Sequence, residues 1–351
     1  MFLKTLKLKN FRNYNELSFG FTAQITILIG DNAQGKTNLL ESIYFLATSK
    51  STKAERDSEL VKNDETFLNV QGEIEVKKDD LVELEIAMEC TETSQKKRVK
   101  VNGVPRRLAD YTGNLAVVLF QPEDINLVTG SPSLRRYFID QTLSQVDREY
   151  KKTIGQYEQI VTRKNRILKL IRENVASVDQ LLYWIEQQVL FGEILSRKRA
   201  ELFQRLNSHK QRFGHNTFKY TASEVTKERL LEYQEREIAS ASSLVGPHRD
   251  DFVFLQDQKD LSKYGSRGEQ RTAVVNLKLA EVEFIEQKLN SKPLLLLDDI
   301  FSELDTAHRQ HVVELSLLQQ TIIATVEFDQ YLRDQFKDFQ IVEVEKGKVK
   351  K

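Results

Sequence analysis

The alternation of apolar and polar positions predicts a chain that begins with strands. Segments with the alternation of antiparallel strands, or with the apolar run of a buried strand, occur at 3–9, 25–30, 67–76, 81–90, 97–101 and 116–120. Asn102-Gly103, which follows one of them, is typical of a hairpin turn. Between the second and third segments, residues 37–46 predict a helix.

The middle of the chain predicts helices. Glycine and proline are almost absent between residues 133 and 213. Apolar residues recur at near-helical spacing over 154–171 and again over 181–195, and a polar break at 174–179 separates the two runs. Two long helices joined by a short turn predict an antiparallel helical hairpin.

The last third alternates helices with buried apolar strands. The expected order is helix 269–289, strand 293–297, helix 306–318 and strand 321–325. This alternation predicts an α/β fold with a parallel core sheet, followed by a frayed, lysine-rich C-terminus. The helical block is then an insertion at 131–240 in one domain, whose two parts we expect at 1–130 and 241–351.

Composition narrows the classes of function. The 351 residues include 52 basic and 52 acidic side chains, so a surface that binds nucleic acid has to be a local patch. The single cysteine, Cys90, is expected in a strand and fits a reducing compartment. Residues 1–8 alternate as a strand does, and no apolar stretch approaches the ~20 residues that span a bilayer. We expect a soluble, cytoplasmic protein without a membrane partner.

The clearest chemical motif is a phosphate loop between a predicted strand and a predicted helix. It fits the pattern G-x-x-x-x-G-K-[ST] and consists of Gly30, Asp31, Asn32, Ala33, Gln34, Gly35, Lys36 and Thr37. In such loops backbone N–H groups bind phosphate, the lysine (Lys36) reaches the β and γ phosphates of ATP, and the hydroxyl (Thr37) holds Mg²⁺. A chance glycine-rich turn is the alternative, and the strand–loop–helix context disfavours it.

Asp298 and Asp299 follow four leucines that predict a buried strand. Because nucleotide binds at the carboxyl edge of such sheets, Asp298 is expected to hold Mg²⁺ directly or through water. Asp299 is expected to orient or deprotonate the attacking water, and a carboxylate shorter than that of glutamate predicts slow hydrolysis. Capping of the next helix is an alternative role, and the two roles are compatible.

The segment Ser266-Arg267-Gly268-Glu269-Gln270 gives a hydroxyl, a glycine that permits close approach and a second positive helix end. Alone, it describes an ordinary helix start. Its place between the phosphate loop and the Asp-Asp strand is the motif order of ATPases that clamp nucleotide between two subunits. Ser266 and Gly268 are therefore expected to contact the nucleotide of a second copy, which makes ATP-driven dimerisation the leading hypothesis.

Three further positions have open interpretations. Gln121, at the end of a predicted strand, either senses Mg²⁺ or the γ phosphate or is a solvent-facing turn residue. Residues 302–305 lie where a dimer-contact loop is expected, and they are equally the start of a helix. Where transporter-type ATPases have a switch histidine, this chain has Thr325-Val326-Glu327, which leaves the sensor of the γ phosphate open.

Together these residues resemble the RecF family of bacterial recombination mediators over essentially the whole chain. The matching stretches are Leu8–Tyr14, the phosphate loop with Asn38–Glu41, Pro122–Asp124, Gly130–Pro132 with Arg135-Arg136, Gly246–Asp251, Ser266–Thr272, Leu297–Asp299 and Ser302–Asp305. The resemblance implies an ABC-type ATPase head, like those of the chromosome-maintenance and Rad50 proteins but without their long coiled coil. It also implies that Arg12 and Asn13 contact the nucleotide.

The function implied by the resemblance is an ATP-dependent homodimer on DNA, in repair, replication, recombination and the SOS response. Such a dimer recognises gaps or junctions of single- and double-stranded DNA and helps RecR and RecO to load the recombinase. Its ATPase is expected to be slow, stimulated by DNA and used as a switch, without chemistry on DNA. The competing hypotheses are the ATPase subunit of a transporter or other SMC-like assembly, and a monomeric phosphate-loop kinase or GTPase.

DNA contacts are expected where basic residues are locally in excess. Residues 133–173 contain ten basic and five acidic side chains. Residues 96–100, with Arg106-Arg107, form a second basic patch. Such patches suit phosphate contacts, which predict binding that is independent of base sequence and weakens steeply with salt. For the first patch, a solvated helix face is the alternative.

Overall fold

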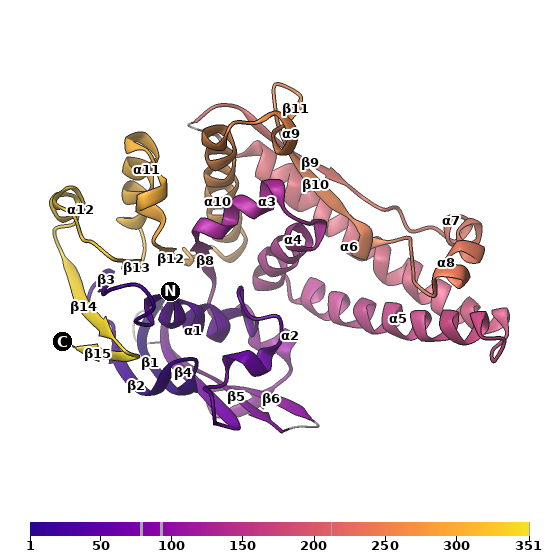
Figure 1. Cartoon of the computed structure of the whole chain (residues 1–351), viewed down its shortest axis with the longest axis horizontal. Helices are drawn as coiled ribbons and strands as arrows, with labels where there is room; N and C mark the ends of the chain where they lie inside the picture. The colour runs from indigo at the N-terminus through magenta and orange to yellow at the C-terminus, as the bar shows by residue number, and fades with distance from the viewer. Residues whose placement is uncertain (78–79, 92–93, 212, 351) are drawn as a thin grey trace. The chain divides into compact units, whose positions relative to one another are not determined.

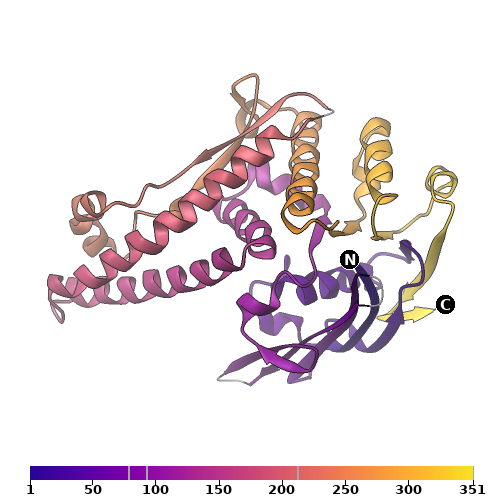
Figure 2. The ribbon, with the colours of Figure 1, turned by 180° about the vertical axis from the view of Figure 1, so that it is seen from behind.

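The computed structural model describes residues 1–77, 80–91, 94–211 and 213–350. The chain forms two compact units, which we call unit 1 (Met1–Asp124 with Glu281–Lys351) and unit 2 (Ile125–Ala280). Figures 1 and 2 show their elements from opposite sides. Unit 1 contains the phosphate loop, and unit 2 contains the helical hairpin.

A mainly parallel sheet forms one layer of unit 1. Within the described residues it has six strands, in the order β15-β14-β3-β13-β12-β8. Their bounds are β3 (Ile25–Ile29), β8 (Val117–Phe120), β12 (Leu294–Asp298), β13 (Thr321–Thr325), β14 (Phe339–Glu345) and β15 (Lys348–Lys350). Neighbours pair in parallel, except for the β14–β15 hairpin. Leu294–Leu297 are at most 1% exposed because strands inside such a sheet are covered on both faces.

The second sheet of unit 1 is antiparallel. Its strands, among the residues described, follow the order β2-β1-β4-β5-β6-β7. Their bounds are β1 (Phe2–Phe11), β2 (Tyr14–Gly20), β4 (Phe67–Lys77), β5 (Asp80–Cys90), β6 (Gln95–Val101) and β7 (Val104–Arg106). Along β4, buried residues alternate with more exposed ones, since only one face packs against the core. Cys90 ends β5, as expected for a strand residue.

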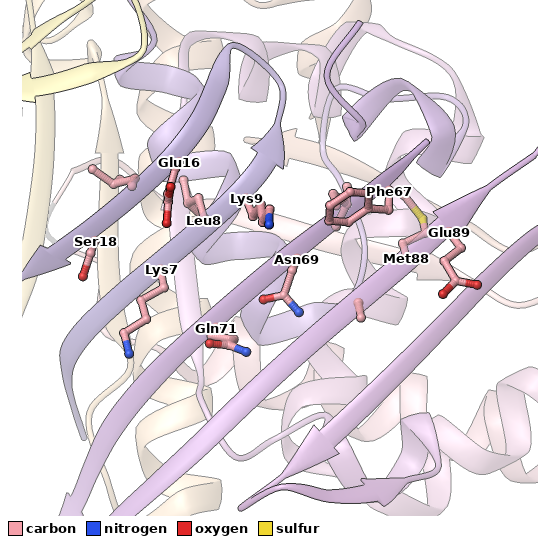
Figure 3. Close-up of a pocket in the computed structure, with 13 residues that line it drawn as sticks. Lys7, Leu8, Lys9, Glu16, Ser18, Phe67, Asn69, Gln71, Met88 and Glu89 are labelled. Carbon is pink, nitrogen blue, oxygen red and sulfur yellow. The ribbon is translucent and has the colours of Figure 1, made fainter. Parts of the chain in front are cut away.

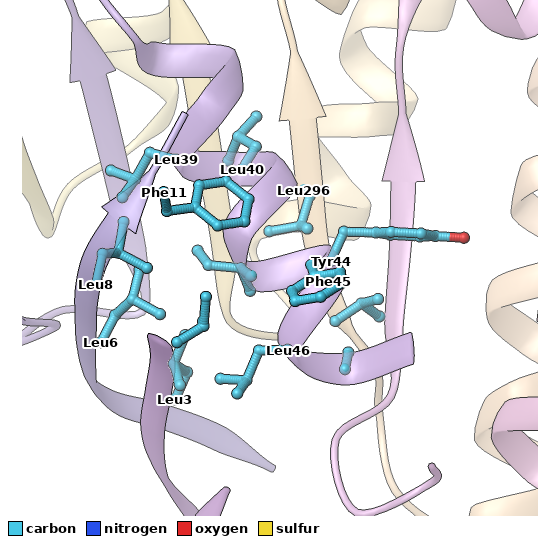
Figure 4. Packing of buried hydrophobic residues seen from close by; sticks show 14 of the residues in the cluster. Leu3, Leu6, Leu8, Phe11, Leu39, Leu40, Tyr44, Phe45, Leu46 and Leu296 are labelled. Carbon is cyan, nitrogen blue, oxygen red and sulfur yellow. The ribbon is translucent and has the colours of Figure 1, made fainter. Parts of the chain in front are cut away.

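Helix α1 (Lys36–Thr48) contacts strands of both sheets and forms the centre of the core of unit 1. Figure 4 shows Leu39 and Phe45 of this helix among leucines of β1 and Leu296 of β12. Every residue of α1 except Thr37 and Asn38 is buried. Burial on this scale fixes the helix, and with it the loop that leads into the helix.

Shorter helices complete unit 1. They are η1 (Asp57–Leu60), α2 (Leu108–Tyr111), η5 (Ile300–Glu303), α11 (Thr306–Ser316) and α12 (Gln330–Gln335). Two helices, η2 (Pro122–Ile125) and α10 (Arg267–Leu289), run across the boundaries of the units. Across the described part of the chain, no helix has both the length and the apolar character that a bilayer crossing requires.

Unit 2 is built on the predicted helical hairpin, which the structure confirms. Helices α5 (Arg148–Arg172) and α6 (Leu182–Ser208) pack along each other, with η3 (Val178–Leu181) at the tip (Figure 1). The other helices are α3 (Asn126–Thr129), α4 (Pro132–Val146), α7 (Lys227–Glu232), α8 (Gln234–Ser240), η4 (Pro247–Arg249) and α9 (Leu261–Tyr264). Strands β9 (Asn216–Thr221), β10 (Asp251–Gln256) and β11 (Lys259–Asp260) form a small antiparallel sheet.

A buried ionic network holds unit 2 together. The guanidinium of Arg199 is 1% exposed and contacts Asp250 at 2.7 Å and Asp140 at 2.8 Å. Arg199 Nε also donates to the hydroxyl of Tyr150 at 2.8 Å, and the backbone N–H of Ser223 donates to Asp250 at 2.7 Å. The segment Gly246–Asp251, one of the stretches that resemble the RecF family, is therefore held inside unit 2 by the ion pair of Asp250.

The C-terminus differs from its prediction. Residues 339–350 are not frayed, because β14 pairs in parallel with β3 and turns back into β15. Val342 and Val344 are at most 2% exposed, which anchors this hairpin in the core of unit 1. The prediction was wrong because the partner strand of β14 lies near the other end of the chain, where local pattern gives no sign of it.

Candidate nucleotide site

The phosphate loop joins β3 to α1 inside unit 1. Ala33 (φ 64°) and Gly35 (φ 118°) have left-handed backbone, which turns the chain sharply before the helix. Gly35 is the N-cap of α1 and has no side-chain oxygen to occupy the first N–H groups of the helix. Lys36 Nζ donates to the carbonyls of Gly30 at 2.7 Å and Asp31 at 3.0 Å, so the ammonium lies over the loop. This arrangement suits a phosphate ligand.

The structure brings Thr37 and Asp298 together, although they are far apart in the sequence. Thr37 Oγ1 donates to Asp298 Oδ1 at 2.8 Å. The carboxylate of Asp298, at the end of β12, is 5% exposed. Burial raises the pKa of Asp298 above its ordinary value, against the opposing effects of the Thr37 hydrogen bond and of Lys53.

The register of the parallel sheet places Gln121 near Thr37 and Asp298. Leu297 pairs with Phe120, so Asp298 and Gln121 follow at the same level on neighbouring parallel strands. Gln121 Oε1 is buried and has no hydrogen-bond partner among the described residues. An orphaned buried oxygen is unfavourable unless a ligand satisfies it. With Thr37 and Asp298, it makes a set of oxygen donors that fits Mg²⁺.

Lys53 lies beside the carboxylates of Asp298 and Glu123, and no role for it was predicted from the sequence. Its Nζ is 3.6 Å from Asp298 Oδ2 and 3.4 Å from Glu123 Oε1. The ammonium thus places a positive charge where the acidic groups converge. Lys53 follows α1 in an irregular segment without a recognisable motif, so no local signal marks it.

Asp299 has left-handed backbone (φ 48°) directly after β12. Its N–H donates to the carbonyl of Ala324 at 2.9 Å. Asp299 is the N-cap of η5, but its side chain makes no capping hydrogen bond. The helix-capping alternative is therefore wrong for Asp299.

Arg12 and Asn13 flank the loop at the β1–β2 turn. Arg12 Nε and Nη2 each donate to Glu41 at 2.8 Å, and the carboxylate of Glu41 is 1% exposed. Asn13 Nδ2 donates to the carbonyl of Gln34 at 3.0 Å. Tyr14 Oη donates to the carbonyl of Gly35 at 3.0 Å. The turn therefore supports the phosphate loop, and contact of Arg12 and Asn13 with the nucleotide stays a prediction.

The signature segment lies in unit 2, at the start of α10. The N–H of Ser266 donates to Glu269 Oε2 at 2.7 Å, and the N–H of Glu269 donates back to Ser266 Oγ at 3.3 Å. The helix-start interpretation is thus confirmed, as a capping box. Ser266 and Gly268 are exposed, and a Cβ added to Gly268 would meet only Ser266 Oγ, at 4.0 Å. Neither packing nor positive φ within the described chain requires glycine here.

The helix-start interpretation of residues 302–305 is also confirmed. Asp305 is the N-cap of α11 and accepts from the N–H of His308 at 2.9 Å.

A separate pocket lies on the exposed face of the antiparallel sheet (Figure 3). It is lined by residues that include Lys7, Lys9, Glu16, Asn69, Gln71 and Glu89. This pocket contains no residue of the phosphate loop.

The basic patches are smaller than the sequence predicted. Lys164 is fully buried and paired with Glu237 at 2.7 Å, and Arg135 pairs with Asp251 at 2.6 Å. Lys97, in the second patch, is 15% exposed and pairs with the carboxylate of Asp57 at 2.5 Å. On α5 the exposed basic residues are Arg148, Lys152, Arg163, Arg166, Lys169 and Arg172.

A protein-family model, RecF/RecN/SMC N terminal domain, matches residues 2–350. The DNA replication and repair protein RecF of Halalkalibacterium halodurans is 36% identical over 375 residues, with both chains covered completely. The chain belongs to the RecF family. The RecF of Lachnoclostridium phytofermentans is also 36% identical, over 363 residues and all of both chains.

A solved structure of the recombination mediator protein RecF-ATP in the RecFOR pathway has the same fold as this chain. The TM-score is 0.88 at 28% identity, and the match covers 99% of this chain and 97% of the other. The expected ABC-type ATPase fold with an inserted helical hairpin is therefore confirmed.

Proposed function

We propose that the chain is an ATP-dependent DNA-binding recombination mediator of DNA repair and replication. The observation that carries the proposal is the hydrogen bond from Thr37 to Asp298 at 2.8 Å, because it joins the phosphate loop to the Asp-Asp strand at one sheet edge. A RecF of the same fold is described with ATP, in the RecFOR pathway.

In the proposed site, the N–H groups at the start of α1 bind phosphate oxygens, and Lys36 neutralises the β and γ phosphates. Thr37, Asp298 and Gln121 hold Mg²⁺, which supplies positive charge at the transferred phosphate when it is bound. Asp299 orients or deprotonates the attacking water. Arg12 and Asn13 contact the same nucleotide from the β1–β2 turn.

Dimerisation follows from the exposed signature segment. Ser266 offers a hydroxyl, and a Cβ at Gly268 would meet nothing nearer than Ser266 Oγ, at 4.0 Å, apart from its chain neighbours and the backbone of its own helix. A glycine without an internal reason is typical of a place where another molecule approaches the backbone. A second copy that carries ATP fits, since Ser266 and the positive end of α10 then face its γ phosphate.

The dimer is proposed to bind DNA at gaps and junctions, with RecR and RecO as partners in loading the recombinase. The exposed basic residues of α5 supply the phosphate contacts. ATP hydrolysis is slow, is stimulated by DNA and releases the dimer, without any reaction on the DNA. A transporter ATPase is disfavoured by the helical insertion and by Thr325 in place of a switch histidine.

The proposal predicts that ATP with Mg²⁺ doubles the molar mass of the protein in solution, measured by light scattering. Ser266→Arg is expected to bind ATP with unchanged affinity but to stay monomeric, because a long charged side chain then stands at the contact. The matched control is Ser262→Arg on α9, whose exposed side chain lies outside the signature. A wild-type protein that hydrolyses ATP as a monomer would contradict the composite site and favour a small-molecule kinase.

DNA binding is expected to weaken steeply with salt, with a slope of about −0.9 per phosphate contact in a plot of log affinity against log salt concentration. The double variant Lys152→Gln/Arg166→Gln should reduce the slope by about two contacts, without changing the preference for base sequence. Arg197→Gln, exposed on α6, is the control. Binding that is insensitive to salt would count against these contacts.

A further inference from the structure

The turn between β14 and β15 touches the phosphate loop, although the two lie at opposite ends of unit 1 in sequence. The N–H of Lys346 donates to Gln34 Oε1 at 2.8 Å. The N–H of the next residue, Gly347, donates to the backbone carbonyl of Gln34 at 2.9 Å. One residue of the loop is thus bound through both its side chain and its main chain.

Glycines allow this close approach on both sides. Gly347 has φ +70°, and a Cβ at this position would lie 2.3 Å from the carbonyl oxygen of Asn13. A Cβ on Gly30, at the start of the loop, would lie 2.3 Å from the carbonyl oxygen of Val344. Neither contact leaves room for a side chain, so glycine is needed at Gly30 where the loop meets the hairpin and at Gly347 where the hairpin meets the β1–β2 turn.

The other side of Gln34 is held by the β1–β2 turn. Asn13 Nδ2 donates to the same carbonyl of Gln34, at 3.0 Å. Asn13 Oδ1 in turn accepts from Asn38 Nδ2 of α1, at 2.9 Å. Gln34 therefore lies in a clamp formed by two turns, immediately before Gly35 and the first N–H groups of α1.

The position of the turn is set by the sheet. β14 runs parallel to β3, and Glu343 pairs with Ile29, the last residue of β3. β3 then leads directly into the phosphate loop, and β14 runs on through Val344 and Glu345 into the hairpin turn, which places the turn beside the loop. The hairpin cannot slide along β3, because Val342 and Val344 are at most 2% exposed in the core.

We propose that the Lys346-Gly347 turn is a positioning element for the phosphates of ATP. By fixing Gln34 it fixes the direction of the N–H groups that follow in the loop, so the site is formed before the nucleotide arrives and the loop loses less conformational freedom on binding. The inference rests on the proposed binding of ATP. It adds a determinant of affinity outside the phosphate-loop motif.

The test is Gly347→Ala, with Gly103→Ala as the matched control. Both glycines are the second residue of a two-residue hairpin turn in unit 1, with φ +70° and +74°, and their preceding residues, Lys346 and Asn102, also have positive φ. A Cβ on Gly103 meets nothing within 4 Å of the described chain. The two substitutions impose the same backbone strain. Only Gly347→Ala brings a Cβ against the backbone of Asn13, which displaces the turn and weakens its hydrogen bonds to Gln34.

We expect Gly347→Ala to raise the dissociation constant for a fluorescent ATP analogue, and the KM for ATP, about tenfold, as the loss of two hydrogen bonds predicts. The kcat should stay within about twofold, because Asp298 and Asp299 keep their places. Gly103→Ala should leave both constants at the wild-type values. Equal affinities for the two variants would overturn the inference, and a wild-type protein that does not bind the analogue would instead overturn the proposed function.

A second variant decides the matter if Gly347→Ala does not fold. Gln34→Met removes the acceptor of the Lys346 N–H and keeps the length of the side chain and the whole hairpin. We expect it to raise the dissociation constant about threefold to tenfold. An unchanged dissociation constant for Gln34→Met would show that the clamp does not position the loop.

Discussion

Asp299→Asn is expected to hydrolyse ATP at least about a hundredfold more slowly than the wild-type chain, while it binds ATP and dimerises normally. Asparagine has the same size and cannot accept a proton, and a positioned general base contributes about 10²–10⁴-fold to such a rate. The substitution is mild for the backbone, because asparagine tolerates the left-handed conformation at φ 48°. Single-turnover hydrolysis with the preformed dimer measures the effect.

Asp298→Asn is the informative comparison. Asp298 accepts a hydrogen bond from Thr37, and it follows β12 at the level where Gln121, with its orphaned oxygen, follows β8. Its loss should raise the Mg²⁺ concentration needed for half-maximal activity, whereas Asp299→Asn should leave that concentration unchanged. If Asp299→Asn hydrolyses ATP at the wild-type rate, Asp299 does not act on the attacking water.

Arg199→Met is expected to lower the free energy of unfolding by about 3–5 kcal/mol, because it leaves buried carboxylates without their counter-charge. Arg199 is 1% exposed, and Asp250, which it contacts at 2.7 Å, is fully buried. Methionine has a similar length and fills much of the space. The loss in free energy of unfolding therefore measures mainly the effect of removing the positive charge. Urea unfolding, followed by the fluorescence of Trp184 in the same unit, measures it.

Arg197→Met is the matched control on the same helix. Arg197 is exposed on α6, so its replacement should change the free energy of unfolding by less than about 0.5 kcal/mol. Similar stability of the two variants would mean that the ionic network adds nothing beyond packing.

The parts of the fold predicted best from the sequence were those with a local cause. The phosphate loop was recognised because its glycines and Lys36 are adjacent in the chain, and α1 follows it as expected. The hairpin of α5 and α6 was predicted from helical spacing alone. The Asp298 strand was predicted because a strand covered on both faces has an unbroken apolar run.

What escaped prediction depends on contacts between distant segments. The six residues of β9 and the hairpin of β14 and β15 have too many polar side chains for a strong pattern, and each is stabilised by a partner strand elsewhere. Lys53 belongs to the same class, since only the folded chain places it near Asp298.

The count of basic residues in the sequence also overestimated the positively charged surface that is exposed for contact with DNA. Lys164 and Arg135 contributed to the basic excess, yet each neutralises a carboxylate inside unit 2. A sequence count treats every charge as solvated, whereas a helix that is packed on one side buries some of its charges in pairs. The exposed cations of α5 are therefore a subset that the structure alone identifies.

The strand order has a consequence for synthesis on the ribosome. β3 lies between β13 and β14, so both of its neighbours are translated about three hundred residues after it. Unit 2, in contrast, is a continuous stretch and can complete its fold while the remainder of unit 1 is still being made. The nascent chain therefore carries an unpaired apolar strand for most of its synthesis. The proposed nucleotide site can therefore form only after β13 and β14 have been made.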